Sequence, residues 1–83
     1  MHDVLPNLIV VRAQWDSEAS VWVAESADIP GLSTEADTLE GLQAKLPAII
    51  ADLIEANGMS GDLPDVPVNI LTSTLTRVAV RQS

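Results

Sequence analysis

Residues 22–39 read WVAESADIPGLSTEADTL and predict a strand, a tight turn, a second strand and the start of a helix. Pro30 and Gly31 suit the two central positions of a type II turn, because proline presets φ at the first and glycine accepts a positive φ at the second. Asp37 or Thr38 can cap a helix that begins at Leu39, since its side-chain oxygen accepts a bond from the first turn. These residues predict a fold and supply no chemistry.

Three short strands are expected around this turn. The first strand is predicted at 8–15, where one face would carry Ile9, Val11, Ala13 and Trp15 and the other Leu8, Val10, Arg12 and Gln14. A polar connection of hairpin length separates it from a second strand at 21–25. A third strand is predicted at 32–36. If Trp15 pairs with Val21, the two tryptophans lie on opposite faces of the sheet, whereas another register places both in the core. We favour burial of both, because tryptophan is highly buried on average.

Residues 39–56 predict a long amphipathic helix. Their apolar side chains fall within an arc of about 140° at 100° per residue, which is wide enough to cover one face of a sheet. Pro47 lies inside this helix and predicts a kink, because it cannot donate to the carbonyl of Gln43. Gly58 suits the left-handed conformation that ends a helix.

A stripe of small residues follows the outer face of the predicted helix. It consists of Gly41, Ala44, Ala48 and Ala51. Small side chains let a second helix or sheet approach closely, which makes the stripe a candidate oligomer interface, although alanine is also simply the best helix former. After the helix, a final strand is predicted at 68–80, where every even position is β-branched. The predicted class is α+β.

The composition indicates a single small acidic domain. The chain has 83 residues, with 12 acidic against 4 basic side chains and a net charge of −8. Such a chain repels nucleic acid and suits a basic partner, although the charge also serves solubility alone. A small domain without cysteine has no disulfides to stabilise it, so we expect a homo-oligomer, with a homodimer as the simplest case. Neither a membrane span nor a signal peptide is visible, so we expect a cytoplasmic protein.

The residues that enzymes use are not combined into a recognisable catalytic site. His2 is the single histidine and has no cysteine or triad pattern to accompany it. Asp16 and Glu18 lack further ligands at the spacing of a cation-binding loop, so they are interpreted as turn residues. Arg77 and Arg81 are too few to form a nucleic-acid patch. We therefore expect no catalytic residue, metal site or cofactor, and no enzyme activity.

The block from Val21 to Leu39 resembles the HicB-like antitoxin superfamily. Its Trp-Val-Ala, Asp-Ile-Pro-Gly-Leu and Glu-Ala-Asp-Thr-Leu pieces are most similar to the DUF1902 branch, as is the helix piece Lys45-Leu46-Pro47. The similarity extends over residues 8–56. It implies a three-stranded antiparallel sheet, a helix and a further strand, sometimes called a partial RNase H fold. We expect one such domain over 1–83, without the DNA-binding module that many relatives add.

The resemblance also implies a function. HicB-like domains neutralise a small basic RNA-cleaving toxin, so a HicA-like protein is the expected partner. The expected contacts are Glu35, Asp37 and Glu40 around the start of the helix, with Trp22 if it is exposed. The alternative is an orphan self-associating domain that binds a small molecule or regulates another protein, without any toxin. The RNase H likeness brings no nuclease activity, because residues 12–14, Arg-Ala-Gln, stand where the first strand would need a metal-binding acid.

Overall fold

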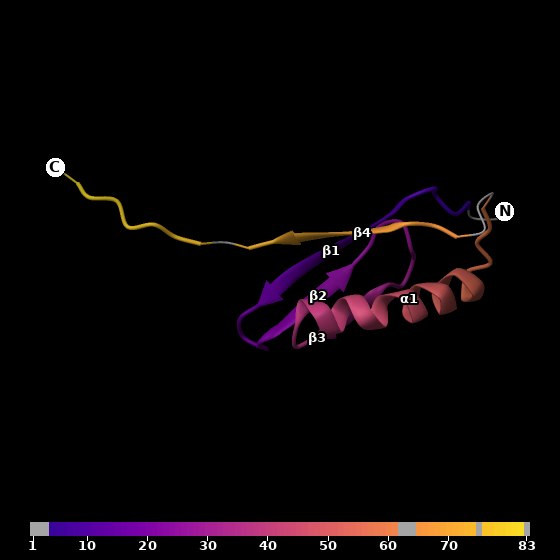
Figure 1. The fold of residues 1–83 in the computed structure, drawn as a ribbon, viewed down its shortest axis with the longest axis horizontal. Helices are drawn as coiled ribbons and strands as arrows, with labels where there is room; N and C mark the ends of the chain where they lie inside the picture. The colour runs from indigo at the N-terminus through magenta and orange to yellow at the C-terminus, as the bar shows by residue number, and fades with distance from the viewer. Residues whose placement is uncertain (1–3, 62–64, 75, 83) are drawn as a thin grey trace.

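The computed structural model describes residues 4–61, 65–74 and 76–82, and Figure 1 shows the fold. The elements follow one another as β1, β2, β3, α1 and β4. The strands are β1 (Ile9–Asp16), β2 (Val21–Glu25), β3 (Ser33–Ala36) and β4 (Val68–Ser73), and the helix is α1 (Leu39–Ala56). The predicted α+β class is confirmed, and the bounds of β2 and α1 agree with those expected from the sequence.

The strands form one four-stranded sheet in the order β3-β2-β1-β4. β1 pairs antiparallel with β2, and β2 pairs antiparallel with β3. β4 follows α1 and lies parallel to β1, since a helical crossover returns the chain in the same direction. The predicted further strand therefore joins the same sheet and becomes one of its two edges.

The helix α1 lies over one face of the sheet, here called the helix face, and the other is called the open face (Figure 1). Alternation along β1 turns every second side chain, beginning with Ile9, towards α1. The buried core consists of Ile9, Val11, Ala13, Ala24, Ile29, Leu32, Leu42, Leu46 and Ile50. Among the described residues, all buried side chains are apolar.

The turn at Pro30 and Gly31 is confirmed. The N–H of Leu32 donates to the carbonyl of Ile29 at 3.2 Å, and Gly31 has a φ of 85°, as a type II turn requires. Ile29 and Leu32 are both buried. The turn therefore brings two apolar side chains into the core while its two central residues stay at the surface.

Both predicted ends of α1 are confirmed. The side chain of Thr38 accepts a hydrogen bond from the N–H of Gly41 at 2.9 Å, which satisfies an N–H of the first turn. At the other end, Gly58 has a φ of 64°, and the N–H of Met59 donates to the carbonyl of Ile54 at 3.0 Å. That bond and the glycine form a Schellman motif. The helix passes through Pro47 as one element, and the kink stays a prediction.

The loop after β2 bonds to the start of β1 at a position that no strand of the sheet reaches from that side. The pairing of β1 with β2 ends at Arg12, so Val10 has no β2 neighbour. Ser26 donates its hydroxyl to the carbonyl of Val10 at 2.6 Å, and the N–H of Val10 donates to a carboxylate oxygen of Asp28 at 2.8 Å. These bonds continue the ladder with side chains in place of a second strand, an arrangement that no local pattern in the sequence predicts.

The predicted extent of the last strand is wrong. β4 ends at Ser73, and the described residues 76–82 belong to no strand. The register of β4 with β1 runs out at the pair Gln14 and Ser73, and no further strand of the described chain lies alongside. A β-branched pattern favours an extended backbone, but a strand also needs a neighbour.

In residues 4–61, 65–74 and 76–82, no helix is long and apolar enough to span a bilayer.

Candidate functional site

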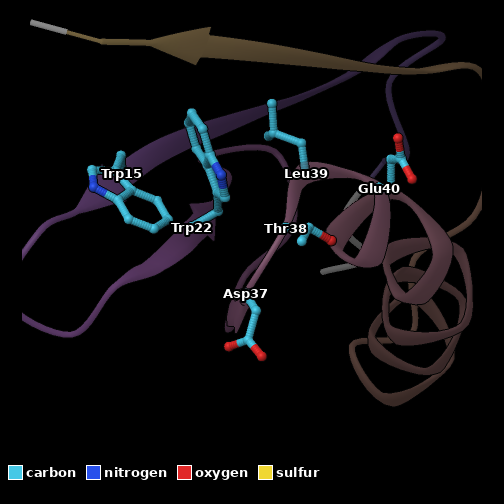
Figure 2. Close-up of a pocket in the computed structure, with 6 residues that line it drawn as sticks. All are labelled: Trp15, Trp22, Asp37, Thr38, Leu39 and Glu40. Atoms are coloured by element: carbon cyan, nitrogen blue, oxygen red, sulfur yellow. The ribbon is translucent and has the colours of Figure 1, made fainter.

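An aromatic hollow lies on the helix face of the sheet, where β1 and β2 extend past the start of α1 (Figure 2). It has a volume of about 580 Å³ and is open to solvent. We call it the aromatic hollow; its lining residues are Trp15, Trp22, Asp37, Thr38, Leu39 and Glu40. Two strands, the connection after β3 and the first turn of the helix each contribute to it.

The two tryptophans form the apolar wall of the aromatic hollow. Trp15 is directly opposite Trp22 in the β1–β2 register, so both side chains are on the helix face. Their ring centroids are 5.6 Å apart at an interplanar angle of 61°, an edge-to-face arrangement that aromatic rings prefer. Trp22 is half-buried against the core, whereas Trp15 is 43% exposed. Thus the register is the one that puts both rings on the core side, but Trp15 remains largely at the surface.

The acidic residues of the hollow are positioned by the start of α1. Thr38 caps the helix, which places exposed Asp37 just before it and exposed Glu40 in its first turn. Negative charge in this position also interacts favourably with the positive end of the helix dipole. Leu39 is half-buried and lies between Trp22 and Glu40 (Figure 2). The hollow therefore combines an apolar wall with a negatively charged rim.

Glu35 does not belong to this site. It pairs with Val23 in the β2–β3 register, whereas the neighbouring pair of Trp22 and Ala36 is on the helix face. Because side chains alternate along a strand, Glu35 projects from the open face. Its backbone carbonyl accepts a hydrogen bond from Lys45 of α1. Of the four predicted contact residues, three therefore line one hollow and Glu35 does not.

Three residues that line the hollow were not predicted as contacts, namely Thr38, Leu39 and the exposed aromatic Trp15. The relevant signal was present, because two tryptophans in neighbouring predicted strands meet if the hairpin register brings them opposite each other. The alternative pairing of Trp15 with Val21, which was not the favoured one, differs from the observed pairing by a single residue. That difference moves a side chain to the other face of a sheet.

The four residues of the predicted oligomer stripe differ in how exposed they are. Ala44, Ala48 and Ala51 are exposed on α1. Gly41 is half-buried, and a Cβ atom built on it would lie 3.1 Å from the Thr38 hydroxyl and 3.7 Å from the Ala36 Cβ. The small size of Gly41 is thus explained within its own chain, by the capped start of the helix.

Asp16, one of the two acids considered for a cation-binding loop, uses its carboxylate within the β1–β2 turn. Within residues 4–61, 65–74 and 76–82, no three histidine or acidic side chains lie close enough together to hold an ion. Asp16 uses its carboxylate to accept hydrogen bonds from the N–H groups of Glu18 and Ala19, at 3.0 and 3.3 Å. Asp16 therefore serves the β1–β2 turn, as its position in the sequence suggested.

Comparison with known proteins gives a family but no activity. No curated protein matches this chain. A solved structure that is similar is a hypothetical protein, TTHA1013, from the extremely thermophilic bacterium Thermus thermophilus, with 46% sequence identity and a TM-score of 0.76. The match covers 86% of this chain and 99% of that one. The family model described as "Domain of unknown function (DUF1902)" matches residues 8–82, and the chain therefore belongs to the DUF1902 family.

Proposed function

We propose that this protein is an antitoxin-type binding domain that masks the RNA-binding face of a small basic toxin, and that it acts by binding and not by catalysis. The observation that carries the proposal is the aromatic hollow, in which Trp15 and Trp22 lie beside the acidic groups Asp37 and Glu40. The resemblance of residues 21–39 to HicB-like antitoxins supplies the class of partner. Such a partner would be met in the cytoplasm, where RNA is translated.

The hollow has the composition of a protein-binding site. Aromatic side chains are enriched among the residues that dominate binding energy, and a half-exposed tryptophan gives a large contact area at low entropic cost. Surrounding charges mainly set the rate of association and the choice of partner. A basic surface would make both kinds of contact here. The apolar stems of its lysines and arginines would pack against the tryptophans, and their charged ends would interact with the acidic rim. The net charge of −8 also disfavours direct binding of this chain to RNA or DNA.

Co-expression with the basic chain encoded beside this one tests the proposal. We expect the pair to form a complex and the toxin to lose its effect on growth. Trp15→Ala should weaken the complex about thirtyfold, as expected for a dominant contact. Leu8→Ala is the matched control, because Leu8 is exposed to a similar extent, at 46% against 43%, and lies outside the hollow. Equal effects of the two variants would contradict the assigned site.

A pair of charge variants tests the rim independently. Glu40→Gln removes a charge at the aromatic hollow, and Glu35→Gln removes the same charge from the open face. Only Glu40→Gln should slow association and reduce its salt dependence, by a severalfold change in the association rate at low salt. If no basic neighbour is encoded, or if it neither binds nor harms the cell, the antitoxin proposal fails.

The second candidate is a self-associating domain without a toxin. The observation that favours it is the outer edge of β4, which is unpaired in the described part of the chain. This candidate gains support if the protein forms a homo-oligomer in solution and no basic neighbour binds it. A small-molecule ligand is not needed for this interpretation.

A further inference from the structure

The outer edge of β4 presents backbone groups that have no partner in residues 4–61, 65–74 and 76–82. β4 ends the strand order, so one side of it faces β1 and the other is open. The N–H of Ile9 donates to the carbonyl of Pro67 at 3.0 Å, which makes the odd-numbered residues face β1. The even-numbered residues, among them Val68 and Ile70, therefore direct their N–H and carbonyl groups outward.

Residues 76–82, here called the tail, continue from β4 without a neighbouring strand (Figure 1). Val78 and Val80 are 81% and 80% exposed, and with Thr76 they extend the β-branched even positions of β4. The radius of gyration is 16.1 Å, whereas a compact chain of this length has about 12 Å. An extended segment that carries exposed valines and lacks a neighbouring strand is not stable by itself in water.

The tail also differs from the rest of the chain in charge. All twelve acidic residues are found at or before Asp65. Two of the four basic residues, Arg77 and Arg81, are found in the tail, which has no acidic residue. A basic tail and an acidic body attract each other, and a second copy of the chain offers the body.

An apolar groove of about 350 Å³ lies between α1 and the start of β4. Its lining includes Ile50 and Ile54 from α1 and Val68 from β4. Val68 is 37% exposed, and Ile54 is half-buried. A strand added to the outer edge of β4 would place its own helix-face side chains beside this groove.

We propose that β4 and the tail pair antiparallel with the same segment of a second copy, so that two sheets join into one across a two-fold axis. Even-numbered residues must pair with even-numbered ones, because only these direct their backbone groups to the outer edge. An axis that passes between the two copies of Thr74 pairs the even-numbered residues 68–74 with the even-numbered residues 74–80 of the second copy. Val78 then faces Ile70 of the second copy, and Val80 faces Val68 of the second copy.

This pairing accounts for the four observations at once. Each tail gains a neighbouring strand, and the outer edge of each β4 is covered. Natural proteins that leave such an edge open protect it from unwanted pairing with charged side chains or β-bulges. The valines of each tail cover the apolar groove of the other copy, and each basic tail is brought to a second chain of net negative charge. Because both copies use the same segment, the interface is isologous and leaves no edge free for a third copy. The assembly is therefore a dimer.

Proline variants test the parity of the pairing. Val78→Pro removes an N–H that faces the second copy, whereas Ala79→Pro removes one that faces solvent, where an edge strand tolerates proline. The wild type should have twice the 8.8 kDa chain mass in analytical ultracentrifugation at tens of micromolar. Since each change occurs twice in the dimer, Val78→Pro should raise the dissociation constant on the order of tenfold more than Ala79→Pro.

Charge substitutions supply the second test. Val78→Lys with Val80→Lys should give the monomer mass, while Val4→Lys, at a similarly exposed valine outside the tail, should leave the dimer intact. Hydrogen exchange should show the Ile70 amide protected in the wild type and not in the double variant.

Several results would overturn the proposal. They are a wild-type monomer, equal effects of the two prolines, or a dimer that survives the lysines in the tail. A dimer that is lost in Ala48→Glu alone would instead assign the interface to the alanine stripe of α1.

Discussion

Asp28→Ala should destabilise the protein more than the loss of a typical hydrogen bond between neutral groups does. The Asp28 carboxylate accepts the N–H of half-buried Val10 at 2.8 Å, at a place where β1 has no β2 neighbour. Bonds to a charged group contribute about 1.5–3 kcal/mol, and an N–H left without a partner costs about 1–3 kcal/mol. We expect a loss of about 2 kcal/mol in the free energy of unfolding. For a domain of this length that lowers Tm by about 10 °C.

Asp16→Ala is the matched control, because the Asp16 carboxylate also accepts hydrogen bonds from backbone N–H groups. Asp16 makes two such bonds, whereas Asp28 makes one. Both of these bonds lie in the exposed β1–β2 turn, where water replaces the lost acceptor. We expect a loss below about 1 kcal/mol, although the number of bonds is larger. Asp28→Asn, which keeps an acceptor oxygen, should recover part of the stability.

Urea denaturation at one fixed protein concentration measures the three variants, since an assembly would make stability depend on concentration. An Asp16→Ala loss that equals or exceeds the Asp28→Ala loss would refute the reasoning. The number of bonds, and not their burial, would then govern stability at these aspartates.

The remaining predictions concern α1 and its ends, and the same denaturation assay measures them. Thr38→Ala should cost about 1 kcal/mol by removing the cap, and Thr38→Ser should stay close to the wild type. Gly58→Ala should cost about 1 kcal/mol because of the positive φ, although the surrounding space is open. Leu42→Ala should cost about 2–5 kcal/mol, and exposed Ala44→Gly only about 1 kcal/mol. A smaller loss for Leu42→Ala than for Ala44→Gly would contradict the assigned core face.

The features that could be predicted from the sequence are local in the chain. α1 follows from the spacing of its apolar residues, and its ends follow from Thr38 and Gly58. The turn at Gly31 follows from the need for a positive φ. Each of these signals acts over a few residues, so the sequence alone determines it.

Pairing between distant segments was harder to predict. The β-branched pattern of 68–80 indicated an extended backbone, but the neighbour of β4 depends on β1, more than fifty residues earlier. The Trp15–Trp22 register depends on the geometry of the hairpin, and one residue of difference decides whether the hollow has one aromatic wall or two. The bonds from Ser26 and Asp28 to Val10 likewise depend on where β2 ends. None of these is encoded by local spacing.

The two proposals meet at the aromatic hollow. Trp15 follows Gln14, which pairs with Ser73, so Trp15 is next to Thr74 across the sheet. If the two-fold axis passes between the two copies of Thr74, the joined sheet runs β1, β4, β4 of the second copy and β1 of the second copy. Three strand spacings, or about 14 Å, then separate Trp15 from Trp15 of the second copy. The axis is then perpendicular to the sheet, so both hollows open on the same side. A dimer built in this way presents two aromatic walls with acidic rims to one partner surface, and two moderate contacts there would act as one strong contact.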